Sequence, residues 1–146
     1  IRAFMEHEKK IELYEPASWR EFEKRINTQK LALKTFLAQL APGSHVVGFG
    51  APAKATTLLH QFELDAKTFE YIVDDSPWKQ GLFTPGKHIP VVEAARLYDN
   101  PPDVVVILAW NFASQIISKH RALLDKGVRF VVPLPKLDIV AKYEMP

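Results

Sequence analysis

Apolar side chains recur every three or four residues between Trp19 and Leu40, a spacing that predicts one long amphipathic helix. We expect this leading helix over residues 18–41. Ser18 and Glu21 have the spacing of a capping box at its start, and a Pro-Gly pair follows its end. Such a helix buries its apolar stripe against the rest of its own domain or against a preceding one.

The residues before this helix have no clear helical period. Residues 10–14 alternate between polar and apolar, which allows a short strand, and Pro16 then interrupts the pattern. We therefore expect residues 1–17 to form an N-terminal arm. Because the chain opens on Ile1 in the middle of a pattern, we interpret it as a piece of a longer polypeptide.

Short apolar runs alternate with helical stretches over residues 45–135, which we expect to form the α/β core. The expected strands are 46–48, 69–73, 104–108 and 130–132, and the expected helices are 52–62, 91–98 and 112–126. The run at 104–108 is apolar throughout, as in strands covered on both faces of a parallel sheet. Strands separated by helices predict right-handed crossovers and an α/β fold with a doubly wound, mostly parallel sheet.

Composition narrows the class of protein. The 146 residues fit one domain. A net charge of +2, with basic and acidic residues interspersed, does not suggest a nucleic-acid partner. No apolar run reaches the roughly 18 residues of a membrane span, and no secretory signal is visible. We therefore expect no membrane partner and a cytoplasmic location. The absence of cysteine excludes disulfides, thiolate zinc sites and cysteine nucleophiles from this chain.

The sharpest motif is Gly48-Phe49-Gly50-Ala51-Pro52-Ala53, placed after an expected strand and before an expected helix. It matches the G-x-G-x-x-G/A pattern, in which backbone amides at a helix N-terminus hold a phosphate. Lys54 follows in the first helical turn, and Asp74 ends the next strand, where dinucleotide enzymes bind ribose hydroxyls. The alternative is a tight strand-to-helix turn that binds no ligand.

A long loop over residues 76–90 is the second feature that suggests function. Lys79 is a candidate phosphate contact, and His88 is the one histidine that we consider as a catalytic acid or base. The alternatives are a rigid surface loop and a hydrogen-bonded surface histidine. Asp74 and Asp75 precede this loop, but adjacent strand residues point to opposite faces, so we predict no metal site.

Trp110 and Asn111 follow the most apolar strand and are expected at the carboxyl edge of the sheet. Open α/β sheets bind ligands at that edge. Asn111 is also a natural N-cap for the helix at 112–126, and Trp110 also fits the core. Both uses of each residue remain open.

The chain resembles the C-terminal domain of the SAM-dependent sugar C-methyltransferases, because several sequence motifs occur here in the same order as in that family. They are GFGAPAK at 48–54, DDSPWKQG at 74–81, PGKHIPV at 85–91 and LAWNF at 108–112. The resemblance runs from about Trp19 to Pro135. It implies a Rossmann-like domain that helps to hold a nucleotide-linked deoxysugar, usually a keto sugar, beside a methyltransferase domain.

The resemblance also assigns residues and partners. It implies substrate contacts at Gly48, Gly50, Ala51, Lys54, Asp74, Trp110 and Asn111, to which the loop adds Lys79. SAM and zinc are expected in two domains upstream of this one, with no cofactor bound here. A domain that lacks those parts is not expected to catalyse methyl transfer alone. The alternatives are an NAD-binding oxidoreductase module, based on the glycine motif and Asp74, and an assembly domain that binds no ligand.

Overall fold

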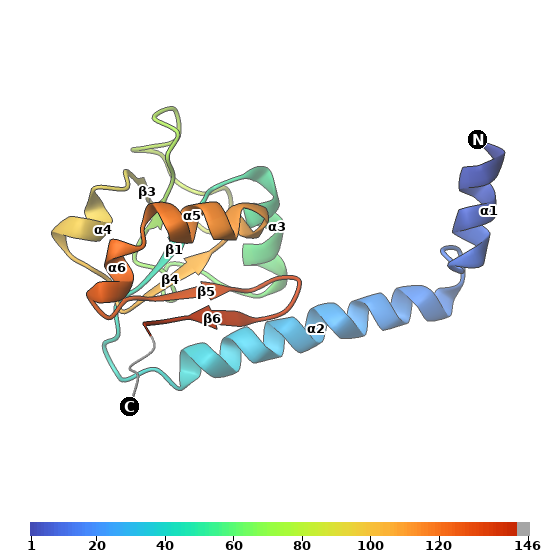
Figure 1. The fold of residues 1–146 in the computed structure, drawn as a ribbon, viewed down its shortest axis with the longest axis horizontal. Coiled ribbons are helices and arrows are strands. Elements are labelled where there is room, and N and C mark those ends of the chain that lie inside the picture. The colour runs from blue at the N-terminus through green and yellow to red at the C-terminus, as the bar shows by residue number, and fades with distance from the viewer. Residues whose placement is uncertain (143–146) are drawn as a thin grey trace.

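The computed structural model describes residues 1–142 and contains one six-stranded sheet in the order β3-β2-β1-β4-β5-β6 (Figure 1). The strands are β1 (Val46–Phe49), β2 (Ile72–Val73), β3 (Val91–Val92), β4 (Val104–Ile107), β5 (Arg129–Val132) and β6 (Asp138–Val140). The first five are mutually parallel, and β6 pairs with β5 in the antiparallel sense. The predicted α/β class and mostly parallel sheet are confirmed.

Helices cover both faces of this sheet. They are α2 (Pro16–Ala38), α3 (Ala53–Gln61), α4 (Arg96–Asp99), α5 (Ala113–Lys119) and α6 (Ala122–Asp125). One core cluster joins α2 and α3 to Val104 and Val106. The other joins α4, α5 and α6 to Val105 and Ile107. Successive residues of β4 thus face opposite layers, and burial of all four explains the unbroken apolar run.

The N-terminal region differs from the expected arm and capping box. Residues Arg2–Lys10 form a helix, α1, and 11–14 form a turn, so the possible strand at 10–14 is wrong. Helix α2 begins at Pro16 with Glu15 as N-cap and no side-chain cap hydrogen bond. Ser18 therefore lies inside the helix. Proline is well suited to the first helical turn, where its missing N–H costs no hydrogen bond.

Three expectations for the core are also corrected. Val91–Val92 is a strand that pairs with β2, so the helix expected over 91–98 shrinks to α4. The helix expected over 112–126 divides at His120 into α5 and α6. Strand β6 extends the sheet beyond the expected limit at residue 135. Short strands and short helices carry too little periodicity to be recognised from sequence alone.

Strands β1, β2 and β4 end at the same edge because they are parallel and in register. Phe49 pairs with both Val73 and Ile107. The residues that follow each strand, Gly50, Asp74 and Leu108, are therefore brought to one edge. No helix within residues 1–142 combines the length and apolarity needed to cross a bilayer.

Candidate functional site

The turn between β1 and α3 lies against the residue that follows β4. Gly50 has φ +94°, and a Cβ placed on it would lie 2.5 Å from the Cβ of Ala109. Gly48 is also crowded, since its Cβ would meet Ile72 Cγ1 at 2.8 Å. Both glycines therefore have a packing role, and Gly50 in addition needs the left-handed backbone that glycine adopts freely.

Asp74 holds this turn in place from the end of β2. Its Oδ2 atom accepts hydrogen bonds from the Ala51 amide at 2.7 Å and the Lys79 ammonium at 3.1 Å. Its Oδ1 atom accepts one from the Ser76 amide at 2.9 Å. Only 8% of Asp74 is exposed to solvent. Both of its carboxylate oxygens thus already serve groups of the protein.

The charge state of Asp74 follows from these contacts. Burial alone raises the pKa of its carboxyl group, but the amide hydrogen bonds from Ala51 and Ser76, together with the Lys79 ammonium, outweigh it. The pKa therefore lies below the usual value for aspartate, and the group is a carboxylate at neutral pH. The sequence analysis expected Asp74 at the end of a strand, and its bond to the glycine turn joins it to Ala51, a residue 23 positions away.

Lys54 and Trp110 come together across the same edge. The Lys54 ammonium lies 4.1 Å from the centre of the Trp110 ring, within the range of a cation–π contact. Lys54 stands in the first turn of α3, and Trp110 opens the 3₁₀ turn η1 (Trp110–Phe112). Both are half-buried. Lys54 and Trp110, which come from two separate sequence motifs, are therefore in contact.

Asn111 and His88 are placed less decisively. Asn111 lies in η1 and is exposed, and α5 has Phe112 as its N-cap, so the alternative of Asn111 as N-cap is wrong. His88 is exposed in the 76–90 loop with φ +51°. Within residues 1–142, no hydrogen bond or ion pair joins its side chain to the glycine turn. Its role as an acid or base stays a prediction.

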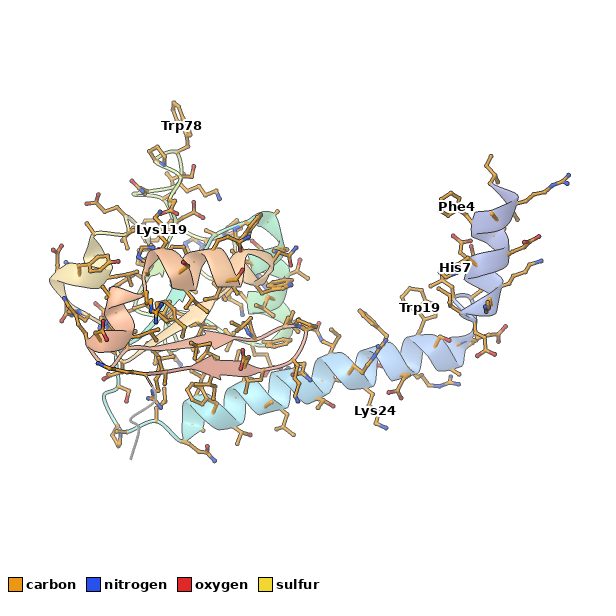
Figure 2. All side chains as sticks on the ribbon, in the orientation of Figure 1. Phe4, His7, Trp19, Lys24, Trp78 and Lys119 are labelled. Atoms are coloured by element: carbon orange, nitrogen blue, oxygen red, sulfur yellow. The ribbon has the colours of Figure 1, made fainter. Side chains whose placement is uncertain are left out.

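The 76–90 loop folds over α3 and leaves a cavity of about 270 Å³ beside the glycine turn. Lys79 lines it, and so do Leu82 and Phe83, which the sequence analysis missed. The remaining lining residues are Ala51, Pro52, Ala55, Thr56, Leu59, Thr84, Pro85 and Val91. The available sequence signal was a pair of adjacent large apolar residues within a Pro/Gly-rich loop. Both residues are more than half exposed in the structure. Trp78, at the loop tip, is 89% exposed and projects away from the sheet (Figure 2).

Asp75 and Lys119 attach the base of this loop to α5. Their ion pair has an Nζ–Oδ2 distance of 2.8 Å. Asp75 and Asp74 thus bind different lysines, Lys119 and Lys79. Within residues 1–142, no three metal-ligating side chains of the His, Cys, Asp or Glu type gather at one point.

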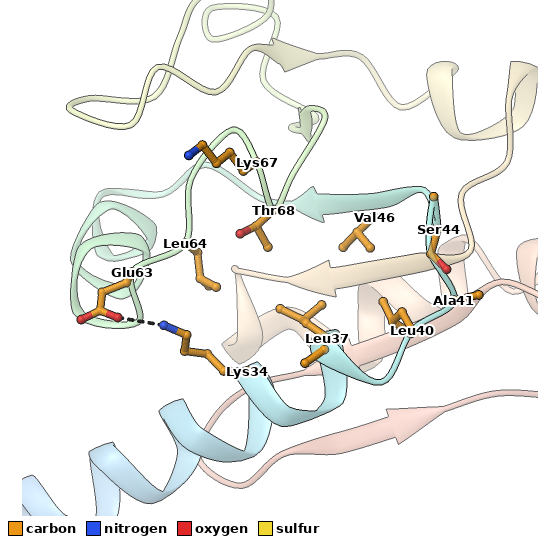
Figure 3. Close-up of a pocket in the computed structure, with 12 residues that line it drawn as sticks. Lys34, Leu37, Leu40, Ala41, Ser44, Val46, Glu63, Leu64, Lys67 and Thr68 are labelled. Carbon is orange, nitrogen blue, oxygen red and sulfur yellow. Dashed lines mark hydrogen bonds and ion pairs between the residues drawn. The ribbon is translucent and has the colours of Figure 1, made fainter.

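A larger cavity of about 360 Å³ lies at the opposite, amino edge of the sheet, between α2 and the segment after α3 (Figure 3). Lys34 and Glu63 line it and form an ion pair of 2.8 Å. Lys30 binds the same carboxylate, and hydrogen bonds from the two lysines lower the pKa of Glu63 to about 2. These charges already satisfy one another, and ligands of open α/β sheets bind at the carboxyl edge. The smaller cavity is therefore the better candidate.

Comparison with known proteins identifies the family of this chain. Residues 1–135 match the family described as the C-methyltransferase C-terminal domain. A curated relative, the C-methyltransferase NovU of Streptomyces niveus, is 34% identical over 102 residues, which are 70% of this chain and 24% of NovU. The matched segment thus spans about a quarter of that relative. The chain belongs to the family of C-methyltransferase C-terminal domains.

Proposed function

We propose that this domain holds a nucleotide-linked deoxysugar at the carboxyl edge of its sheet, for SAM-dependent methylation by another domain of the same polypeptide. Catalysis, SAM binding and zinc binding are assigned to domains that precede this one. The chain has no cysteine, and residues 1–142 gather no set of three metal ligands, so zinc does not fit here. The domain's own task is then to bind and orient the substrate in the cytoplasm.

The start of α3 carries this proposal. Its N-cap is Pro52, which makes no side-chain hydrogen bond to the first turn, and that turn contains no acidic residue. A helix N-terminus in this state attracts anions, because its first amides point outward and carry partial positive charge. Asp74 accepts a hydrogen bond from the amide of Ala51, one residue before the cap, and binds no amide of the α3 turn itself.

The Lys54 ammonium adds a full positive charge at the same place. Within residues 1–142, Lys54 forms no ion pair with a carboxylate, and its ammonium contacts the ring of Trp110. An ammonium held over an indole face is free to bind a phosphate oxygen on its open side. We propose that Gly50 and Ala51 bring the backbone close to the diphosphate and that Asn111 and Lys79 add side-chain contacts to it.

Asp74 and Gly48 have a different part in this proposal from the one expected. We propose that Asp74 and Gly48 fix the position of the glycine turn through contacts within the protein and do not contact the ligand. Both carboxylate oxygens of Asp74 already accept hydrogen bonds, from Ala51, Ser76 and Lys79. This favours a nucleotide-sugar over NAD, because an NAD enzyme needs that carboxylate for the ribose hydroxyls. The strand order 3-2-1-4-5-6 is that of the dinucleotide-binding sheets, with β6 antiparallel here, and it supports the proposal of a Rossmann-like fold.

Isothermal titration calorimetry separates these functions. We expect thymidine diphosphate and its sugar conjugates to bind to the 146-residue chain with a stoichiometry of one, and NAD to give no heat. Binding of NAD alone would favour the oxidoreductase module. No binding of any nucleotide to a chain with a folded circular dichroism spectrum would contradict the proposal and favour an assembly domain.

A further inference from the structure

Helix α1 and the first part of α2 project away from the sheet domain (Figure 1). We call residues 2–25 the N-terminal overhang. Helix α1 buries no residue, and every residue from 16 to 25 is exposed except the half-buried Ser18. Large apolar side chains are nevertheless concentrated here. Those exposed by about half or more are Phe4, Met5, Ile11, Tyr14, Trp19 and Phe22.

Trp19 and Phe22 continue the stripe by which α2 packs on its own domain. At 100° per residue, they fall on the same side of the helix as Ile26 and Leu33, which contact the core. Their rings pack edge to face with centroids 6.3 Å apart. Leu31 and Lys24 fall on the other side of the helix. One stripe is therefore buried along its second half and open to solvent along its first.

The open half of the stripe lies on the side of α2 that faces the sheet domain. Trp19 points to the side of α2 on which the sheet domain lies, and Phe4 points from α1 toward the same side, whereas Lys24 points away from it (Figure 2). Exposed aromatic side chains gathered on one side of a helix are typical of protein interfaces, where tryptophan, tyrosine and arginine supply most of the binding energy. Both signs of charge flank the stripe, so no polyanion is indicated.

The N-terminal overhang is energetically unfavourable when no partner covers its apolar side chains. Isolated helices shorter than about 12–15 residues are marginal in water, and in proteins their stability comes from packing of an apolar face. The nine residues of α1 and the first ten of α2 have no such packing within residues 1–142. A partner that covers Trp19 and Phe22 would provide it.

We infer that the N-terminal overhang is the docking surface for the domain that precedes it in the C-methyltransferase polypeptide. This inference rests on the proposed function in assuming that a catalytic domain lies upstream. The family match spans residues 1–135 and so includes the overhang, while the matched segment is 24% of the relative NovU. A domain joined to α1 is held at millimolar effective concentration beside this stripe, an advantage that a second copy of the chain lacks.

Photocrosslinking in the complete polypeptide tests this surface. We would replace Phe22 by p-benzoyl-phenylalanine, irradiate, and identify the crosslinked peptide by mass spectrometry. The matched control carries the same group at Leu31, an exposed apolar position on the opposite side of α2. The expected result is a crosslink from position 22 to the preceding domain of the same molecule, and none from position 31.

Every other pattern overturns the inference. Crosslinks from position 22 to a second copy of the chain would identify a dimer interface instead. Equal crosslinking from both positions would show that the contact is not specific to this stripe. No crosslink from position 22 would show that the stripe is not covered. As a second measurement, residues 16–25 should exchange amide hydrogens at least about tenfold more slowly in the complete polypeptide than in the 146-residue chain, and Phe22→Ala but not Leu31→Ala should abolish the difference.

The docking surface and the proposed function can be rejected separately, because different measurements test them. Thymidine diphosphate binding is measured on the 146-residue chain, whose carboxyl edge lies on the sheet domain and contains none of residues 2–25. Nucleotide binding without crosslinking would therefore reject the docking surface alone. Crosslinking without nucleotide binding would reject only the substrate-holding role.

Discussion

The Asp74 carboxylate lies 2.7 Å from the Ala51 amide, so the residue after β2 fixes the backbone of the turn after β1. The same carboxylate binds the Lys79 ammonium and so anchors the start of the 76–90 loop. One buried charge thus joins the two walls of the cavity beside α3. A glycine-rich turn shaped in this way is rigid before any ligand arrives, which lowers the entropic cost of binding.

Asp74→Asn should destabilise the fold by about 2 kcal/mol, because a neutral amide cannot accept from Ala51, Ser76 and Lys79 together and leaves a buried donor unpaired. Urea denaturation monitored by circular dichroism measures the change. The neighbouring Asp75→Asn is the control. Its ion pair with Lys119 is half exposed, so the loss should stay below about 1 kcal/mol. Equal effects of the two variants would show that Asp74 does not hold the turn.

Gly50→Ala should be among the most damaging small substitutions in the chain. Its Cβ would enter the space of Ala109 at 2.5 Å, and its φ of +94° is strained for any L side chain. Strain and overpacking together should cost at least about 3 kcal/mol in the free energy of unfolding. Gly127→Ala separates the two causes, because Gly127 has φ +85° with nothing within 4 Å of the added Cβ. It should cost about 1 kcal/mol; similar losses for both would contradict the close approach of Ala109.

Stability should fall on mild acidification because of His120, which is 2% exposed. Burial lowers the pKa of its ring first, the Lys119 ammonium lowers it further, and Asp75 opposes them. The unfolded chain takes up a proton near the usual pH of 6.5, and the folded chain only at lower pH. The contribution of the neutral ring is therefore full above pH 6.5 and is lost as the pH falls from there through the lowered pKa.

Urea denaturation at pH 7.5 and pH 5.5 checks this sign. The midpoint should drop at the lower pH for the natural chain and for the exposed-site control His7→Gln. The drop should shrink in His120→Phe, which keeps a ring beside Phe49 and removes the titrating group. A pH dependence that is unchanged in His120→Phe would assign it to other residues.

Lys54→Met should weaken the binding of thymidine diphosphate about tenfold or more, because it removes one charge-assisted hydrogen bond and keeps the side-chain stem over Trp110. Calorimetric titration gives the ratio of dissociation constants. Lys67→Met is the matched control, since Lys67 is an exposed lysine that lines the cavity at the opposite edge. If Lys67→Met weakens binding as much as Lys54→Met does, the ligand lies at the other edge.

The parts of the fold that could be predicted from sequence are those with long or unbroken patterns. Val104–Ile107 reads as a buried strand because both of its faces are covered, and the glycines at 48 and 50 mark a turn that admits no Cβ. Strand β3 has two residues and β6 three, too few to show a period. The start of α2 was misplaced because Ser18 and Glu21 have cap spacing wherever they fall, and Pro16 suits a helix start as well as a break.

The same distinction, between features with a sequence pattern and features without one, applies to the candidate site. Trp110 and Lys54 were predicted at one edge because parallel strands align their ends, and they are in contact there. The partners of Asp74 could not be predicted, since its bond to Ala51 depends on how two loops approach each other in space. Leu82 and Phe83 were missed for the same reason. Their place over α3 follows from the path of the 76–90 loop and has no periodic signature.

The most direct test of the central claim is to map the backbone amides that respond to thymidine diphosphate by nitrogen–proton correlation NMR. We predict that the amides of Ala53 and Lys54 and the indole N–H of Trp110 shift progressively with ligand, while those of Ser44 and Thr68 at the opposite edge stay in place. Shifts centred on Ser44 and Thr68, or none at the first turn of α3, would contradict the account.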